Sequence, residues 1–156
     1  MKSWSKEIEI DAPIDQVWGL LDGSLEEMQK IMPQVVDHKP VKVTDEGVGS
    51  IYRQKYKEGK RIEEYDVETL EYENAPDRKK LKVGFTLAKM FEITALYELS
   101  QITEQKTLFT YTCTNQPLKS FLKLFLLFAS DKIVVQFCER VKNVAEEENK
   151  KANLLV

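Results

Sequence analysis

The segment IYRQKYKEGKRIEEYDVE, residues 51–68, decides the fold because its charges assign side chains to the two faces of a hairpin. Successive side chains of a strand point to opposite sides, so three cations share one face of the first strand: Arg53, Lys55 and Lys57. One face of the second strand carries three acids: Glu64, Asp66 and Glu68. A turn around residues 58–59 therefore predicts an antiparallel pair with cations opposite acids.

The other face of this hairpin is mostly aromatic, and the same pairing turns all of it to one side. We expect six side chains to look inward together: Tyr52, Gln54, Tyr56, Glu63, Tyr65 and Val67. Alternation in the later segments continues this face in three rows: Leu81, Val83, Phe85 and Leu87; Phe91, Ile93, Ala95, Tyr97 and Leu99; Phe109, Tyr111 and Cys113. The pattern predicts a meander of about six strands with one polar and one aromatic face.

The residues before this meander change their period twice. Residues 3–10 alternate polar with apolar side chains, which is typical of a half-buried strand. Apolar residues then recur at helical spacing between Pro13 and Leu21, and Asp22-Gly23 ends that segment. Ser24 and Glu27 form a capping-box pattern for a second short helix, Leu25 to Ile31. We expect one strand and two short helices here.

An aromatic sheet face needs a cover, and the C-terminal segment is the part of the chain left to supply it. From about Pro117 to Lys150 it contains no internal Gly or Pro and reads as a helix. Its second half carries one apolar stripe: Val134, Phe137, Cys138, Val141, Val144 and Ala145. We expect this stripe to lie on the sheet.

The order of these parts resembles the helix-grip fold of the START-like superfamily, which includes birch-pollen allergens, plant abscisic-acid receptors and bacterial polyketide cyclase/dehydrase-like (SRPBCC) proteins. Four segments carry the resemblance: EIDAPIDQVWGLL, MPQVV, EGVGSIYRQ and IEEYDVETLEYEN. It covers nearly the whole chain and implies one α+β domain over residues 1–156, with a curved antiparallel sheet wrapped around a long C-terminal helix and two short helices after the first strand.

The resemblance also implies a cavity for a lipophilic small molecule between the sheet and the long helix. The inward rows then become candidate cavity walls: Tyr52, Gln54, Tyr56, Glu63, Tyr65, Val67, Phe85, Phe91, Ile93, Tyr97, Phe109, Tyr111, Val134, Phe137 and Val141. The turns KEGKR and LAKMF do not resemble the gate loops of the plant hormone receptors. Hormone sensing is therefore not implied.

Composition limits the partners. The net charge of −3 comes from mixed charges and favours neither nucleic acid nor an anionic membrane. The two cysteines, Cys113 and Cys138, lack metal-site spacing and read as small buried hydrophobic residues, and the sole histidine, His38, reads as a strand or loop residue without a special role. We expect no metal, no cofactor, no integral membrane segment, a cytoplasmic location, and a monomer or homodimer.

Glu63 leaves two interpretations open, because a carboxylate is costly to bury without a partner. It either meets water, Tyr and Gln groups in a cavity, or it lies at a hairpin end in solvent. The leading hypothesis is a protein that binds or carries a lipid, isoprenoid, quinone or polyketide-like molecule. The alternatives are a cyclase- or dehydratase-like enzyme with Glu63 as acid or base, and a protein-interaction module. The residues present no recognisable catalytic motif.

The stretch SFLKLFLLFASDKIVVQF, residues 120–137, is too short in its apolar run and too interrupted by Lys123 to span a membrane. Continuing the helical stripe backwards leaves three residues on the opposite side: Phe121, Phe125 and Phe128. Either the helix breaks near residues 129–131, or these phenylalanines stay partly exposed as a lid or docking patch.

Overall fold

The computed structural model describes residues 1–119 and 130–155. Its elements follow in the order β1 (Lys2–Ile10), α1 (Ile14–Leu21), α2 (Leu25–Ile31), β2 (Val35–Lys42), β3 (Ile51–Glu58), β4 (Arg61–Asn74), β5 (Arg78–Leu87), β6 (Phe91–Thr103), β7 (Lys106–Pro117) and α4 (Lys132–Leu154). This is the expected α+β order of one strand, two short helices, a run of strands and a long C-terminal helix.

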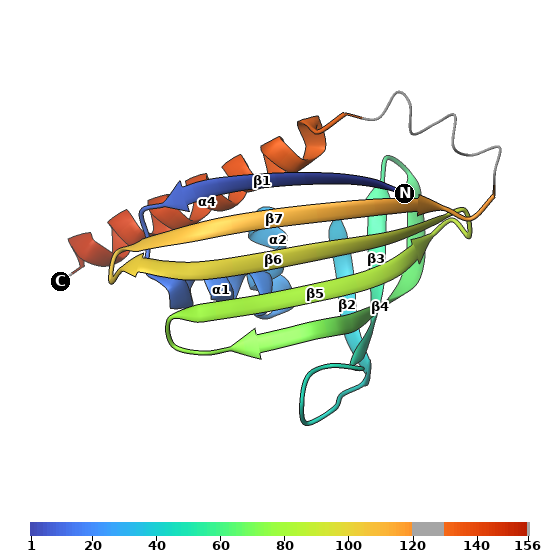
Figure 1. The fold of residues 1–156 in the computed structure, drawn as a ribbon, viewed down its shortest axis with the longest axis horizontal. Coiled ribbons are helices and arrows are strands. Elements are labelled where there is room, and N and C mark those ends of the chain that lie inside the picture. The colour runs from blue at the N-terminus through green and yellow to red at the C-terminus, as the bar shows by residue number, and fades with distance from the viewer. Residues whose placement is uncertain (120–129, 156) are drawn as a thin grey trace.

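The strands form one antiparallel seven-stranded sheet in the order β1-β7-β6-β5-β4-β3-β2. The meander from β2 to β7 pairs each strand with the next one, and β1 adds to its far edge beside β7. The three helices of the described residues, α1, α2 and α4, lie on one side of the sheet, behind it in Figure 1. The long helix α4 runs along β1 and packs against β1, β7, α1 and α2.

The β3–β4 hairpin confirms the pairing expected from its charges. Arg53 lies opposite Asp66, with their Nε and Oδ1 atoms 3.0 Å apart, and Lys55 lies opposite Glu64. Lys57 instead lies opposite Ile62, so only two of the three cations face an acid. The inner face keeps its expected register, with Tyr52 opposite Val67 and Gln54 opposite Tyr65.

The hydrophobic core gathers where α1 and the C-terminal half of α4 meet the sheet. Phe109, Leu99 and Ile10 are fully enclosed there, and Val141 of α4 packs into the same cluster. Four residues of the expected helix stripe are buried: Val134, Cys138, Val141 and Ala145. The other two, Phe137 and Val144, are partly buried and pack against the core from its margin. The stripe is therefore confirmed as the surface that α4 turns to the sheet.

The two short helices have the bounds that the sequence indicates. In α2 the Ser24 hydroxyl accepts a hydrogen bond from the Glu27 backbone N–H at 3.3 Å, which is the cap that the pattern predicts. Pro13 precedes α1 as its N-cap residue. The buried side of α1 carries Val17, Trp18 and Leu20.

The predicted start of the C-terminal helix is wrong. Pro117 is the last residue of β7, where it lies opposite Phe91, and Leu118 donates its backbone N–H to the Met90 carbonyl at 2.8 Å. Pairing with β6 thus holds the chain in an extended form through the proline, beyond the last residue paired with β1. The helix α4 begins at Lys132, directly after the break expected near residues 129–131. Phe121, Phe125 and Phe128 lie outside the described residues.

Polar contacts tie the C-terminal half of α4 to the turn after β1. The Asp11 backbone N–H donates to Glu146 Oε2 at 2.8 Å, and Asn149 Nδ2 donates to the Asp11 carbonyl at 3.1 Å. Lys142 Nζ donates to the Glu9 carbonyl at 2.9 Å, and Arg140 reaches the carbonyl at the end of α2.

Within residues 1–119 and 130–155, no helix is long and apolar enough to cross a membrane.

The core position of Phe109 predicts a large effect of truncation. Phe109 is 0% exposed, so Phe109→Ala should lower the free energy of unfolding by about 3–5 kcal/mol through lost burial and a residual cavity. Ile62→Ala is the control, because Ile62 is 56% exposed and its truncation should change stability by only about 0.5 kcal/mol. Urea denaturation followed by circular dichroism measures both, and equal effects would contradict the assignment of the core.

Candidate functional site

The inner face of the sheet divides into a closed part and a half-buried part. Five of the predicted wall residues are fully buried: Val67, Tyr97, Phe109, Val134 and Val141. Ten are half-buried: Tyr52, Gln54, Tyr56, Glu63, Tyr65, Phe85, Phe91, Ile93, Tyr111 and Phe137. Most of the second group lies on strands β3, β4, β5 and the start of β6, away from the strands that α4 contacts.

Aromatic rings join the two parts beneath α4. The rings of Tyr97 and Tyr111 stack at 5.3 Å between centroids, and Phe137 of α4 packs 4.8 Å from the ring of Tyr111. Burial raises the pKa of both phenols, so both stay protonated at neutral pH. This cluster marks where the helix cover meets the aromatic face.

A chain of hydrogen bonds crosses the half-buried part through three neighbouring strands. His38 Nδ1 of β2 lies 2.9 Å from Gln54 Oε1 of β3, and Gln54 Nε2 donates to the Tyr65 hydroxyl of β4 at 3.0 Å. The register explains this contact, because His38 lies opposite Gln54 and Gln54 lies opposite Tyr65. Cross-strand neighbours on one face are close enough for their side chains to bond.

Ring stacking holds both ends of this chain. The imidazole of His38 stacks on Tyr52 with centroids 4.8 Å apart and planes 10° from parallel. The ring of Tyr65 stacks on Phe85 of β5 at 5.0 Å and 23°. Stacked rings restrict side-chain rotation, so the polar atoms keep their direction in the absence of a ligand.

Burial keeps this chain uncharged. It lowers the pKa of His38 from its usual 6.5, an effect that the bond to Gln54 and the nearby charge of Asp37 partly offset. Burial likewise raises the pKa of Tyr65 from 10.0, and the bond from Gln54 opposes that rise. At neutral pH the site therefore presents a neutral imidazole, an amide and a neutral phenol.

Glu63 lies at the edge of this region, near the start of β4. Its Oε1 atom is 2.5 Å from Nη2 of Arg61, an exposed residue of the same hairpin, and its side chain is 23% exposed. Glu63 lies opposite Tyr56, as the hairpin register predicts. The carboxylate thus has a cationic partner at the hairpin end.

Asn115 adds a polar atom to the inner face. It lies on β7 opposite Ile93, and Ile93 lies opposite Phe85. Its Oδ1 atom is buried and accepts no hydrogen bond within the part of the chain that the structure describes. A buried acceptor without a partner is costly, so a donor group in this position would be stabilised.

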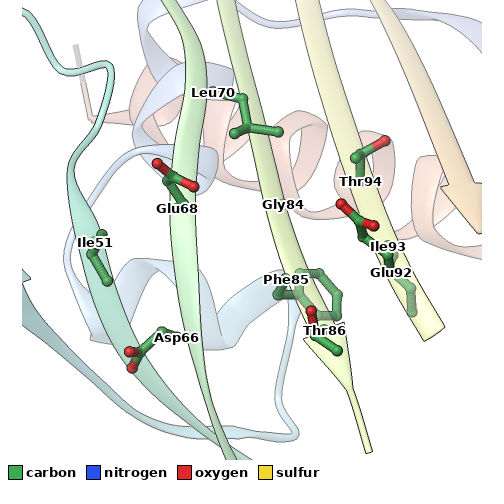
Figure 2. Close-up of a pocket in the computed structure, with 10 residues that line it drawn as sticks. All are labelled: Ile51, Asp66, Glu68, Leu70, Gly84, Phe85, Thr86, Glu92, Ile93 and Thr94. Atoms are coloured by element: carbon green, nitrogen blue, oxygen red, sulfur yellow. The ribbon is translucent and has the colours of Figure 1, made fainter. Parts of the chain in front are cut away.

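A hollow of about 260 Å³ lies on the opposite, outer face of the sheet. Figure 2 shows it around Gly84, with Glu68, Leu70 and Thr94 on the viewer's side of the strands. Leu70 lies within the register shift of β4, between Thr69 and Glu71, and its Cδ1 atom fills the space that a side chain at Gly84 would need. Phe85 and Ile93, two predicted wall residues, contribute to its lining.

Comparison with solved structures identifies the fold. Norcoclaurine synthase from Thalictrum flavum, a point mutant in complex with a transition-state analogue, matches with a TM-score of 0.63 at 16% identity, covering 94% of this chain and 95% of that chain. Major latex-like protein 151 from Panax ginseng matches with 0.64 at 16%, covering 95% and 97%. The di-domain ARO/CYC protein BexL of the BE-7585A biosynthetic pathway matches with 0.71 at 13%, covering 92% of this chain and 46% of BexL.

The chain has the helix-grip fold that these structures share. At these identities the likeness shows the fold alone. No family model matches the sequence, and a search of curated proteins found no match. The resemblance noted in the sequence is thereby confirmed for the helix-grip architecture.

Sequence reasoning missed His38 in this helix-grip sheet. The segment VVDHKPVK does not alternate, because β2 contains register shifts after Val35 and after Pro40. Alternation counted along the sequence therefore cannot assign His38 to a face. His38 could have been assigned to the aromatic face only by pairing residues 35–42 with the strand that contains Gln54, because this pairing places His38 opposite Gln54.

Because His38 is the sole histidine of the chain, its titration can be measured without overlap from another imidazole. Proton NMR of the imidazole should give a pKa below 6.5 in the folded protein and near 6.5 in urea. The folded state then binds this proton less readily than the unfolded chain, so the free energy of unfolding should fall as the pH drops below about 6.5. Asp37→Asn should lower the His38 pKa further, because the charge of Asp37 raises it. A folded value above 6.5 would contradict the burial of this ring.

Proposed function

We propose that the protein binds or carries a hydrophobic small molecule in a cavity between the inner face of the sheet and α4. The observation that carries this proposal is the half-buried aromatic face formed by Tyr52, Tyr65, Phe85 and Ile93. Apolar surface with a few directed polar groups is the usual composition of a ligand site. The polar groups here are the His38–Gln54–Tyr65 chain and the carbonyl oxygen of Asn115.

The structural neighbours support a ligand of this kind. The norcoclaurine synthase structure holds a transition-state analogue within the same fold, so the helix-grip frame accommodates a small organic molecule. We propose that residues 1–156 act as one binding domain in the cytoplasm, as a monomer or homodimer, without a cofactor or nucleic acid. A lipid, isoprenoid, quinone or polyketide-like compound would suit the aromatic wall.

The geometry favours binding over acid–base catalysis. In the chain of hydrogen bonds the Gln54 amide separates the imidazole from the phenol. An amide relays a proton only if its own C–N and C–O bonds rearrange. Glu63 is paired with Arg61 at the hairpin end and is not part of this chain of hydrogen bonds. The enzyme hypothesis, with Glu63 as acid or base, remains the alternative, and it expects Glu63→Gln to abolish turnover while leaving the affinity for the ligand largely intact.

A blocked inner face tests the proposed function. The uncharged dye N-phenylnaphthylamine should bind the wild-type protein saturably, with a rise in fluorescence as it enters an apolar site. Ile93→Trp adds bulk to the inner face and should weaken that binding by about tenfold or more. Glu92→Trp is the matched control, because Glu92 is the neighbouring residue of the same strand on the outer face and is exposed.

Circular dichroism of both variants verifies that each remains folded, and native mass spectrometry of the wild-type protein looks for a co-purifying species. Saturable dye binding that survives Glu92→Trp and is lost in Ile93→Trp supports the inner face as the site. Absence of both dye binding and a co-purifying species in the wild type would overturn the proposed function. Equal loss in both variants would move the site away from the inner face.

A further inference from the structure

The bonds of the His38–Gln54–Tyr65 chain run in one direction. The Oε1 atom of Gln54 can only accept, so the hydrogen in its contact with His38 belongs to Nδ1. The amide Nε2 of Gln54 can only donate, so the Tyr65 oxygen accepts from it. Gln54 therefore uses both of its capacities within the chain, whereas His38 and Tyr65 each use one.

The unused capacities at the two ends follow from this direction. Within residues 1–119 and 130–155, the Tyr65 hydroxyl has no hydrogen bond other than the one from Gln54, so its own O–H is free to donate. The neutral imidazole of His38 keeps a lone pair on Nε2. A phenol that already accepts a hydrogen bond is a stronger donor, because bonded chains polarise one another.

The charged and polar groups around Tyr65 limit which ligands its hydroxyl can bind. Glu63 precedes it by two residues on the same face of β4. Burial is the main cause of the raised pKa of the phenol, and the negative charge of Glu63 adds to it. An anionic ligand at the hydroxyl would meet the same repulsion. A pure hydrocarbon would remove water from the hydroxyl and offer no acceptor, which is costly for a buried polar group.

We propose that Tyr65 anchors the ligand by donating its hydroxyl hydrogen to an uncharged carbonyl oxygen, with Gln54 and His38 as positioning residues that hold the hydroxyl in place. This proposal rests on the proposed function and narrows it to hydrophobic carbonyl compounds. Phe85, stacked on Tyr65, extends a flat apolar surface from the anchor. A planar aromatic or conjugated ketone, aldehyde or quinone meets both requirements, since its ring packs while its oxygen accepts.

The direction of the chain can be tested without any ligand. Nitrogen NMR of the sole histidine should show the neutral tautomer protonated at Nδ1, in a bond to Gln54 Oε1. In Gln54→Leu this preference should be lost. If the wild-type imidazole carries its hydrogen on Nε2, the amide is reversed, the Tyr65 hydrogen is used within the chain, and the proposal is overturned.

Three probes of one shape test the ligand class. Methyl naphthyl ketone carries an uncharged carbonyl, ethylnaphthalene replaces that carbonyl with CH₂, and naphthoate carries a negative charge. Titration calorimetry of the wild-type protein should show tightest binding of the ketone. Tyr65→Phe removes only the hydroxyl and should weaken ketone binding by about tenfold while leaving ethylnaphthalene unchanged. Tyr72→Phe is the matched control, because the Tyr72 hydroxyl lies outside the chain and donates to Asp22 Oδ2 at 2.8 Å.

Infrared spectroscopy of the bound ketone reads the bond directly. Its carbonyl stretch should be lowered in wild-type protein and in Tyr72→Phe, and should return to the value for an apolar solvent in Tyr65→Phe. Equal binding of ketone and ethylnaphthalene, with no effect of Tyr65→Phe, would overturn the carbonyl anchor and leave the proposed function standing. Preferential binding of naphthoate would also overturn it. Failure of all three probes to bind would overturn both proposals.

Discussion

A single helix is too narrow to cover a seven-stranded sheet, and this difference in width determines how the inner face of the sheet is covered. Neighbouring strands lie about 4.8 Å apart, so six spacings span about 29 Å, whereas a helix with its side chains is about 10–12 Å across. The helix α4 takes the β1 and β7 edge, and α1 and α2 lie beside it. Among the described residues, the part of the inner face toward β2 through β5 receives less cover from these helices, and most of its predicted wall residues are half-buried.

The chemistry of the inner face changes where that cover changes. Beneath the helices it is a close-packed core of Phe109, Leu99 and Ile10. Beyond them the same alternating pattern places hydrogen-bonding groups among the rings, with Gln54 bonded on both sides. Hydrogen-bonding groups do not improve the packing of a core, because each such group needs a hydrogen-bond partner when it is buried. The two parts of the face thus differ in chemistry, one a close-packed apolar core and the other a half-buried surface with hydrogen-bonding groups.

The sequence predicted what depends on local alternation and local caps. The hairpin register of residues 51–68, the rows on β5 to β7 and the bounds of α1 and α2 all follow from side chains a few residues apart. The start of α4 was wrong, because the strand pairing of Pro117 with Phe91 is a contact between distant segments. The role of His38 was missed for the same reason, since the register shifts in β2 hide its face until β2 is placed beside β3.

The polar ties between α4 and the turn at Asp11 have a mechanical consequence. They come from Glu146 and Asn149, near the C-terminal end of the helix, and the first residue, Lys132, lies about 21 Å along the axis from Glu146. A tilt of about 10° about that end displaces Lys132 by about 4 Å and leaves the bonds to Asp11 almost unchanged. Such a tilt would have to displace buried Val134 and the ring of Phe137, which packs 4.8 Å from the ring of Tyr111, so apolar packing on the sheet holds this end of α4.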